Sequence, residues 1–511
     1  MAPVPPHLRL SPLHSSGPWL IAAVFVLAAF LRFHHLGSAP PGLFSDEAIN
    51  GVNAMEAIQN GHFQVFYPDN NGREGLFINI QAVFLKIFDL FRASSPFDVE
   101  PWMLRVPSAL FGTFTVIGLF FLTRTLTGSE FTAGAAAFFV ATSFWHINFS
   151  RIGFRAISAV FWFTWALYLL FWGFLNLAPE PRGKAYGVLA AAGLVYGVGF
   201  HSYIAYRVTP LLILLVLGWL GKRFIQLNQT KLWLQGAALF LSTAILTAAP
   251  LALYFLHHPD AFFARVNQTS VLSSADRGHR LWSNIGSTAL MLNVAGDQLA
   301  RHNVPGRPEV FLPVGILLLL GLGLGLKRAI QRSPDAWPFM LCLVWLMVAA
   351  APAVFSNEGV PHAMRSILMI PPCFILAALG ADRVRRWLIP RFSQRTLTIA
   401  GAAVALLLAV EAYWTYFHVF ALDPRTETAF EANLADLGRE IAEAPLTAPK
   451  YIVFANAKLD QRGCPPDFYS VLLLCGGFSP RERENRNIHI VVNGEEAQRV
   501  EHLPGAYVWI L

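Results

Sequence analysis

The sequence predicts a polytopic α-helical membrane protein with about 11 membrane-spanning helices and a small C-terminal α/β domain. Of its 511 residues, 55% are hydrophobic and only 14% are charged, whereas a soluble domain has about 25% charged residues. The net charge of +7 is no sign of nucleic-acid binding, because basic residues in a membrane protein usually mark its cytoplasmic loops.

The candidate spans are apolar segments close to the length of about 20 residues that crosses a bilayer. All are rich in Gly, Ala or Leu, which suits close helix packing in lipid. They lie at residues 18–34, 106–123, 131–147, 156–177, 185–203, 208–221, 232–256, 310–326, 336–356, 366–381 and 396–418.

The distribution of Lys and Arg predicts the orientation. With a cytoplasmic N-terminus, the basic residues gather in the cytoplasmic loops, most densely between Arg383 and Arg395. The positive-inside rule then places residues 35–105, residues 257–309 and the C-terminal tail outside the membrane. We therefore expect a multi-pass plasma (inner) membrane protein whose first span is a retained anchor, with an extracytoplasmic C-terminal domain.

Two polar parts of the chain should carry structure of their own. Leu76–Phe91 has apolar residues on most faces and predicts a helix lying in the membrane interface. We divide the chain into a transmembrane catalytic domain, residues 1–420, and a small domain, residues 421–511, with a helix from Pro424 and strands at 450–455, 487–492 and 506–511. Cys464 and Cys475 could form a disulfide in an extracytoplasmic domain.

The adjacent acids Asp46 and Glu47 are the leading candidates for chemistry. Carboxylates near a bilayer are costly to desolvate and are often functional. The bland interpretation is a helix cap, since Ser45-Asp46-Glu47 precedes a plausible helix whose N-terminus favours acids. The two interpretations are compatible, because a helix can hold a catalytic carboxylate rigidly.

Basic and aromatic residues on the same predicted face could bind an anionic substrate. Arg is suited to phosphate because it offers bidentate donors, although snorkelling to lipid headgroups or a solvated turn would explain single residues equally well. In a helix, Arg151 and Arg155 would share one face. The substrate-binding candidates are Arg73, Glu74, Arg151, Arg155, Tyr203, Tyr206, Arg207, Arg301, His302, Arg307, His362 and Arg365.

Several of these segments carry a family resemblance. The chain resembles the GT-C glycosyltransferases, specifically the group of protein O-mannosyltransferases and aminoarabinose transferases. The resemblance spans roughly residues 18–420. It rests on five segments: Phe44–Ala48 (FSDEA), Asn71–Phe77 (NGREGLF), Arg105–Gly112 (RVPSALFG), Phe149–Arg155 (FSRIGFR) and Pro361–Ser366 (PHAMRS).

The resemblance implies an inverting glycosyltransferase that moves a sugar from a polyprenyl-phosphate donor to an acceptor hydroxyl on the outer face of the membrane. By this analogy Asp46 is the general base, and Glu47 orients it or binds the acceptor. Arginines would stabilise the leaving phosphate. The acceptor stays open between protein, lipid and glycan, because Gly-Arg-Glu-Gly (72–75) replaces the His-Pro-Pro type of several members. A divalent cation is possible, with no compelling ligand set.

A transporter or flippase of lipid-linked sugars is the alternative function. It should place charges or broken helices near the bilayer midplane, often in repeated halves. The charges of this chain lie mostly at the ends of the predicted spans. The sequence therefore favours the enzyme.

Overall fold

A computed structural model describes most of the chain, and every structural statement below concerns the residues that it describes. These are residues 17–69, 72–91, 98–177, 183–263, 271, 276–333, 336–357, 359–454, 464–465, 468–492, 500 and 505–510. Asn70 and Asn71, which the sequence places next to Arg73, lie outside the described residues.

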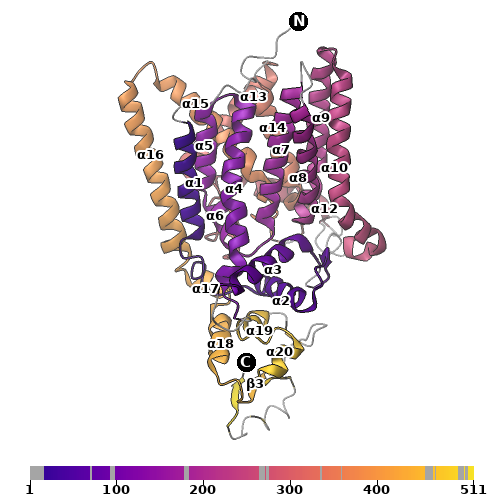
Figure 1. Ribbon diagram of the computed structural model, residues 1–511. Helices are drawn as coiled ribbons and strands as arrows, with labels where there is room; N and C mark the ends of the chain where they lie inside the picture. The colour runs from indigo at the N-terminus through magenta and orange to yellow at the C-terminus, as the bar shows by residue number, and fades with distance from the viewer. Residues whose placement is uncertain are drawn as a thin grey trace.

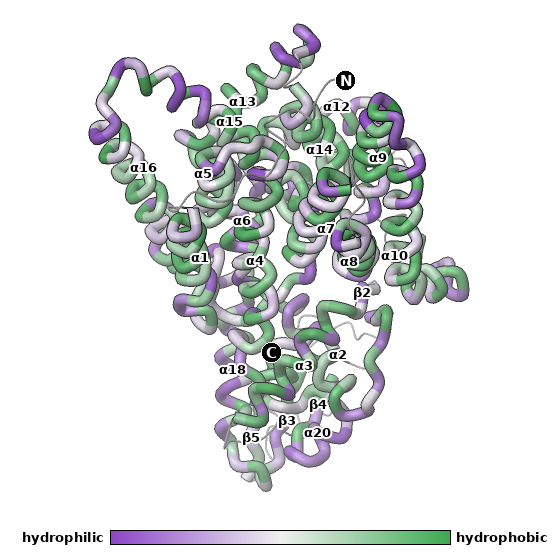
Figure 2. The backbone as a smooth tube through the Cα atoms, turned by 45° about the horizontal axis from the view of Figure 1, so that its top comes forward, coloured by the Kyte–Doolittle hydropathy of each residue, from purple (hydrophilic) through white to green (hydrophobic). Residues whose placement is uncertain are grey.

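A bundle of long apolar helices forms the body of the protein (Figure 1). Figure 2 shows hydrophobic residues along the bundle helices and hydrophilic residues gathered at the helix ends and connections. The helices are α1 (Gly17–Phe33), α4 (Pro101–Thr127), α5 (Glu130–Ala141), α6 (Phe144–Arg151), α7 (Ala156–Leu177), α8 (Gly183–Val198), α9 (Thr209–Gln226), α10 (Thr230–His257), α13 (Leu312–Ile330), α14 (Trp337–Val354), α15 (Ile370–Leu388) and α16 (Gln394–Trp414).

The predicted fold class is confirmed, and the predicted spans coincide with apolar helices. The exception is 131–147, which is divided between α5 and α6 because the chain breaks at Thr142 and Ser143. Within the described part of the chain, 9 helices are long and apolar enough to cross a membrane. Gly17–Phe33 and Glu130–Ala141 are apolar but shorter. The predicted count of 11 spans therefore remains a prediction, since it depends on these two helices.

The first polar loop folds at one end of the bundle. Helix α2 (Ser45–Asn60) and helix α3 (Gly75–Asp89) pack against each other there, joined by a two-stranded antiparallel sheet of β1 (Phe66–Tyr67) and β2 (Arg73–Glu74). Helix α3 was predicted from Leu76–Phe91. Figure 1 shows both helices between the bundle and the C-terminal segment, at the end opposite the label of the N-terminus.

The C-terminal segment contains the three strands that the sequence predicts. They are β3 (Lys450–Val453), β4 (Ile488–Val491) and β5 (Tyr507–Ile510), in a parallel sheet of order β4-β3-β5. The single helix predicted from Pro424 is divided into α17 (Pro424–Ala429) and α18 (Ala432–Glu443), because Glu431 adopts a left-handed conformation with φ of 54°. Helices α19 (Tyr469–Leu474) and α20 (Pro480–Asn485) complete the segment.

The hydrophobic cores show how these parts are joined. One core lies within the helix bundle. A second core combines residues of the first loop and the start of α4 with residues of the C-terminal segment, among them Leu43, Met55, Leu104 and Leu473. The division at residue 420 stays a prediction, and the C-terminal segment shares its core with the first loop. Cys464 and Cys475 are buried, and no disulfide joins them in the described structure, so the pairing considered from the sequence is not formed.

Candidate active site

Asp46 and Glu47 lie in the first turn of α2, where the helix dipole favours negative charge. The expected side-chain cap from residues 45–47 is wrong. The N-cap residue is Phe44, which makes no side-chain cap, and its carbonyl accepts hydrogen bonds from the backbone N–H groups of Glu47 and Ala48. The backbone of α2 therefore positions the two acids, and neither side chain caps the helix.

Arg73 fixes the direction of the Asp46 carboxylate. One terminal nitrogen of Arg73 donates to Oδ1 of Asp46 at 2.7 Å. The other donates to the Asp46 carbonyl at 2.7 Å and to Oδ1 of Asn50 at 2.5 Å. The Arg73 side chain is buried, whereas that of Asp46 is 36% exposed. This carboxylate is thus held rigidly and still reaches open space.

That open space is a small pocket between the first loop and the bundle, with an empty volume of about 290 Å³. It combines a carboxylate and two guanidinium groups with two aromatic rings. Its lining residues are Asp46, Asn50, Arg73, Phe154, Arg155, Ala156, Tyr203 and Met364.

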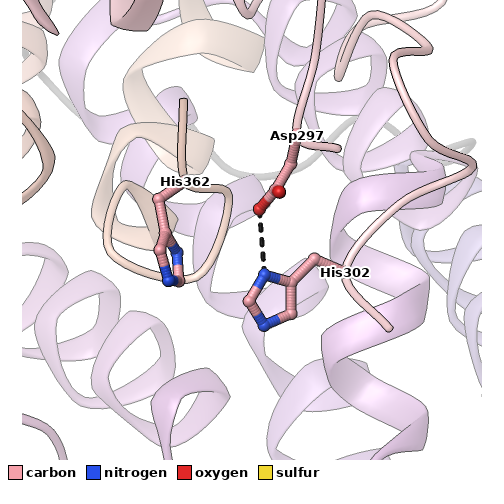
Figure 3. Close-up of side chains that lie close together, drawn as sticks. All are labelled: Asp297, His302 and His362. Atoms are coloured by element: carbon pink, nitrogen blue, oxygen red, sulfur yellow. Dashed lines mark hydrogen bonds and ion pairs between the residues drawn. The ribbon is translucent and has the colours of Figure 1, made fainter. Parts of the chain in front are cut away.

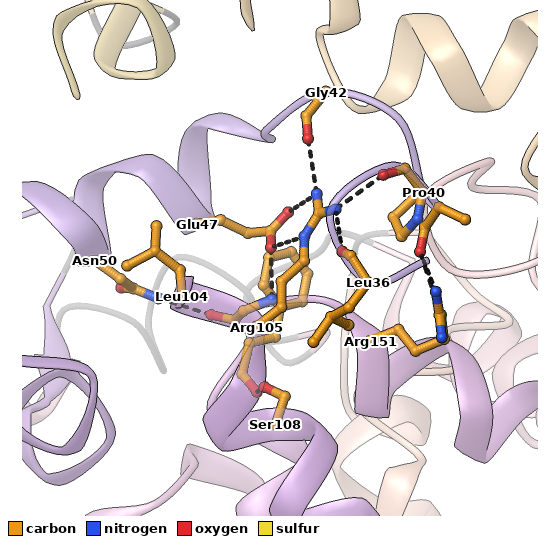
Figure 4. Close-up of polar contacts among 12 residues, drawn as sticks. Leu36, Pro40, Gly42, Glu47, Asn50, Leu104, Arg105, Ser108 and Arg151 are labelled. Carbon is orange, nitrogen blue, oxygen red and sulfur yellow. Dashed lines mark hydrogen bonds and ion pairs between the residues drawn. The ribbon is translucent and has the colours of Figure 1, made fainter. Parts of the chain in front are cut away.

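Glu47 does not line this pocket, and its carboxylate points to Arg105 (Figure 4). Its side chain is fully buried and accepts hydrogen bonds from Nε and a terminal nitrogen of Arg105 at 3.0 and 3.1 Å. The backbone N–H of Gly153 donates to the same carboxylate at 2.6 Å. These contacts hold the Glu47 carboxylate beneath the helical turn that carries Asp46, where it does not line the pocket.

Arg151 and Arg155 do not share a helical face as the sequence analysis expected. Helix α6 ends at Arg151, and the chain turns before α7 begins at Ala156. Arg151 is fully buried and donates to the carbonyls of Leu31, His34 and Ala39. The hydrogen-bond donors of its guanidinium thus bind backbone carbonyls, which argues against the phosphate-binding interpretation of this residue.

Arg155 instead lines the pocket and pairs with Glu74. Its Nε donates to Oε2 of Glu74 at 2.9 Å, and its guanidinium lies 5.6 Å from the ring centroid of Tyr203. Arg207 contacts the other oxygen of Glu74 at 3.4 Å. Glu74 therefore joins an arginine that lines the Asp46 pocket to one that lies outside it.

Arg207 lies in the wall of a large apolar groove. The groove has an empty volume of about 1270 Å³ and, apart from this one cation, only apolar lining. The Arg207 guanidinium lies 5.0 and 4.7 Å from the ring centroids of Phe255 and Phe262. The lining residues are Phe200, Arg207, Ala248, Leu251, Ala252, Phe255, Leu256, Pro259, Phe262 and Phe263.

The two predicted tyrosines have different places. Tyr203 lines the pocket beside Arg155. Tyr206 is fully buried among Phe163, Tyr196 and Phe200, and its hydroxyl donates to the Tyr196 carbonyl at 3.1 Å. Tyr206 therefore belongs to the bundle core rather than to the pocket.

A second polar cluster lies where the 297–309 loop meets the segment before α15. Figure 3 shows Asp297, His302 and His362 turned toward one another. Oδ2 of Asp297 accepts from the backbone N–H of Ala363 at 2.8 Å and lies 2.9 Å from Nδ1 of His302. Met364, which follows this cluster in the chain, lines the Asp46 pocket.

These three side chains could hold a metal ion. Each offers one ligand atom, and the three atoms lie within 4.8 Å of one another. Burial, followed by nearby charges that include Arg365, lowers the pKa of His362 well below its usual range, and burial also lowers the pKa of His302. Both imidazoles are thus neutral near pH 7, and neutral imidazole is the form that binds metal.

The orientation of His302 also fits a ligand. Its Nδ1 faces the Asp297 carboxylate, while its Nε2 is buried without a hydrogen-bond partner among the described residues. The donor set would suit zinc or a similar divalent ion.

Two of the remaining predicted arginines, Arg301 and Arg365, lie near this cluster. The Arg301 guanidinium lies 4.9 Å from the ring centroid of Phe44, the N-cap residue of α2. Arg365 is close enough to His302 and His362 to lower their pKa. Arg307 lies elsewhere, in an ion pair with Glu411 of α16. Arg301 and Arg365 thus remain candidates for the site, and Arg307 does not join the pocket.

Sequence reasoning missed three residues of this region. Asn50 accepts from Arg73 and donates to the Gly153 carbonyl at 3.1 Å. Its position four residues after Asp46, on the same helical face, was a usable signal. Arg105 and Asp297 stood inside segments of interest, but only the tertiary structure reveals their carboxylate and imidazole partners.

Comparisons with known proteins agree with this architecture. The family model for dolichyl-phosphate-mannose-protein mannosyltransferase matches residues 22–262. The sequence itself matches no curated protein. Among solved structures, the archaeal oligosaccharyltransferase AglB from Archaeoglobus fulgidus, in complex with an inhibitory peptide and a dolichol-phosphate, is 13% identical with a TM-score of 0.54, covering 94% of this chain and 69% of that one.

ArnT from Cupriavidus metallidurans is similar over almost the whole of both chains. Its structure bound to undecaprenyl phosphate is 16% identical with a TM-score of 0.55, covering 95% of this chain and 91% of that one. The chain has the GT-C fold. This fold confirms the predicted fold class. The family match over residues 22–262 agrees with the predicted glycosyltransferase activity.

Proposed function

We propose that this GT-C glycosyltransferase transfers a sugar from a polyprenyl-phosphate donor to an acceptor hydroxyl on the outer face of the membrane, with Asp46 as the general base. The observation that carries the proposal is the bridge formed by Glu74. Through Arg155 and Arg207, this carboxylate joins the pocket of Asp46 to the apolar groove.

A lipid-linked donor fits this pair of cavities. The apolar groove suits a polyprenyl chain, and the arginines between groove and pocket suit the phosphate at its end. The ArnT and AglB structures support this class of donor, since one is bound to undecaprenyl phosphate and the other to a dolichol-phosphate.

The chemistry requires a base and a stabilised leaving group. The Asp46 carboxylate takes the proton of the acceptor hydroxyl as its oxygen forms a bond to the anomeric carbon. The bond from that carbon to the phosphate oxygen breaks, and the electron pair leaves with polyprenyl phosphate. Arg155 and Arg207 stabilise the charge that grows on the phosphate. A single displacement of this kind inverts the anomeric centre.

The arrangement of the acids supports the assignment of roles. Asp46 is partly exposed at the pocket and held by Arg73, whereas Glu47 is buried against Arg105. A base must reach the proton that it removes. Asp46 meets this requirement, and Glu47 supports the turn of helix from which Asp46 projects.

The test is transfer activity of Asp46→Asn in membranes supplied with radiolabelled polyprenyl-phosphate sugar. Loss of a positioned general base should reduce turnover by about 10²–10⁴-fold. Asp436→Asn is the matched control, because Asp436 is an exposed residue of the C-terminal segment, 75% accessible in its ion pair with Arg439. Unchanged turnover in a folded Asp46→Asn protein would remove Asp46 from the mechanism.

A further inference from the structure

The C-terminal segment contacts helix α2 near its middle. Helix α19, whose six residues are all buried, packs against α2. The contact is closest at Gly51, where a Cβ atom would lie 2.4 Å from Cδ2 of Leu473 and 2.9 Å from Cδ1 of Leu104. Gly51 is thus held between the C-terminal segment on one side and α4 on the other, one residue after the pocket residue Asn50.

Two further contacts lie at the ends of the same helix. Gly42, just before α2, has φ of +69°, and a Cβ there would lie 2.4 Å from the carbonyl oxygen of Phe430. At the other end, Nε2 of Gln59 donates to Oε1 of Glu482 at 2.9 Å, and Oγ of Ser479 donates to Oε1 of Gln59 at 3.3 Å. The C-terminal segment therefore touches α2 before its start, at its centre and at its end.

Other residues of α2 bond to the helix bundle. Asn50 and Glu47 bond to Gly153 and Arg105 of the helix bundle. The residues that line the Asp46 pocket fall between Asp46 and Met364 in the chain. In the described structure the C-terminal segment thus acts on the pocket through α2 rather than through a side chain of its own.

We propose that the C-terminal segment is a positioning element for transfer. Its contacts through Phe430, Leu473 and the Ser479–Glu482 turn press α2 against the bundle and so set the place of the Asp46 carboxylate. The inference rests on the proposed role of Asp46 as the base. It follows from geometry, because a helix confined at three points cannot shift without opening a packed core. A displacement of about 1 Å in a catalytic group can lower turnover by as much as 10²-fold.

The experiment introduces a methyl group at the central contact of the full-length protein. Gly51→Ala should lower kcat by about tenfold or more while leaving the donor KM within about twofold. The double variant Gly51→Ala/Leu473→Ala should restore most of kcat, because removing the Leu473 methyl groups makes room for the new Cβ. Leu446→Ala, a substitution of a 60% exposed residue in the same segment, is the control and should leave kcat unchanged.

Each result bears on the proposal. Normal kcat in folded Gly51→Ala, a change confined to the donor KM, or no recovery in the double variant would overturn it. Should Gly51→Ala fail to fold, Gln59→Ala removes the contacts to Ser479 and Glu482 without a clash, and an unchanged kcat there would equally overturn it. Asp46→Asn separates the two ideas: if it is inactive while these variants keep full kcat, only the positioning role fails.

Discussion

Glu47 and Arg105 form an ion pair with both side chains fully buried, directly beneath the turn of helix that presents Asp46 to the pocket. Arg105 also donates to the carbonyls of Leu36, Pro40 and Gly42, so that one guanidinium ties α4 to the loop before α2 (Figure 4). The pair consequently fixes both the entry into α2 and its first turn.

Neutralising this pair should destabilise the protein. Glu47→Gln leaves the Arg105 guanidinium buried without its counter-charge, and removing one partner of such a pair typically costs about 3–5 kcal/mol. We expect a clearly lower midpoint of thermal unfolding in detergent. Asp436→Asn breaks an exposed pair with Arg439 and should change stability by about 0–1 kcal/mol. Equal midpoints for the two variants would show that the buried pair stabilises the protein no more than the exposed pair does.

The arginines separate into two classes with different expected phenotypes. Arg155→Ala should raise the donor KM by about 10-fold or more, because a lost hydrogen bond to a charged group costs about 1.5–3 kcal/mol. Arg151→Ala should instead lower the amount of folded protein, since Arg151 bonds to three backbone carbonyls. Steady-state kinetics and fluorescence-detected size exclusion measure the two effects. A donor KM that Arg155→Ala leaves unaltered would place the phosphate elsewhere.

The apolar groove predicts a dependence on the lipid of the donor. Ala252→Trp fills the groove that Ala252 lines and should raise the KM for a long polyprenyl donor by about tenfold, the effect of roughly two lost CH₂ contacts. The KM for a donor with a short chain should change little. Leu253 follows Ala252 in α10 but is 54% exposed and does not line the groove. Leu253→Trp therefore serves as the control. Equal effects of both variants on both donors would argue against a lipid in this groove.

The sequence predicted the secondary structure of this chain well because its signals are local. Apolar segments of membrane length and short β-branched strands such as Ile488–Val491 are visible without tertiary information. The helix after Pro424 was predicted too long because nothing in its sequence announces the left-handed residue Glu431, which is neither Gly nor Asn.

The candidate site was predicted by residue type but not by role. Asp46, Arg73, Arg155 and Tyr203 do converge on one pocket. In the sequence, Glu47 is as good a candidate base as Asp46. On a helix, however, the side chains of consecutive residues point about 100° apart, so the Glu47 side chain points to Arg105 rather than to the pocket. Arg151 was indistinguishable from Arg155 for a similar reason: the end of α6 between them could not be inferred from spacing alone.

The cluster of Asp297, His302 and His362 predicts that the protein binds a divalent ion. Purified protein dialysed against zinc should retain about one ion per chain, as expected for two imidazoles and a carboxylate. His362→Ala should lose it, because two remaining ligands hold a metal poorly. His418→Ala is the control, since His418 lies in the π-helical turn after α16 and stacks on Trp414. Mass spectrometry measures the zinc content of each protein, a readout that does not depend on enzymatic activity. Were His362→Ala to retain as much zinc as the unaltered protein, the ion would be bound elsewhere and the cluster would be a hydrogen-bonded support for the 297–309 loop.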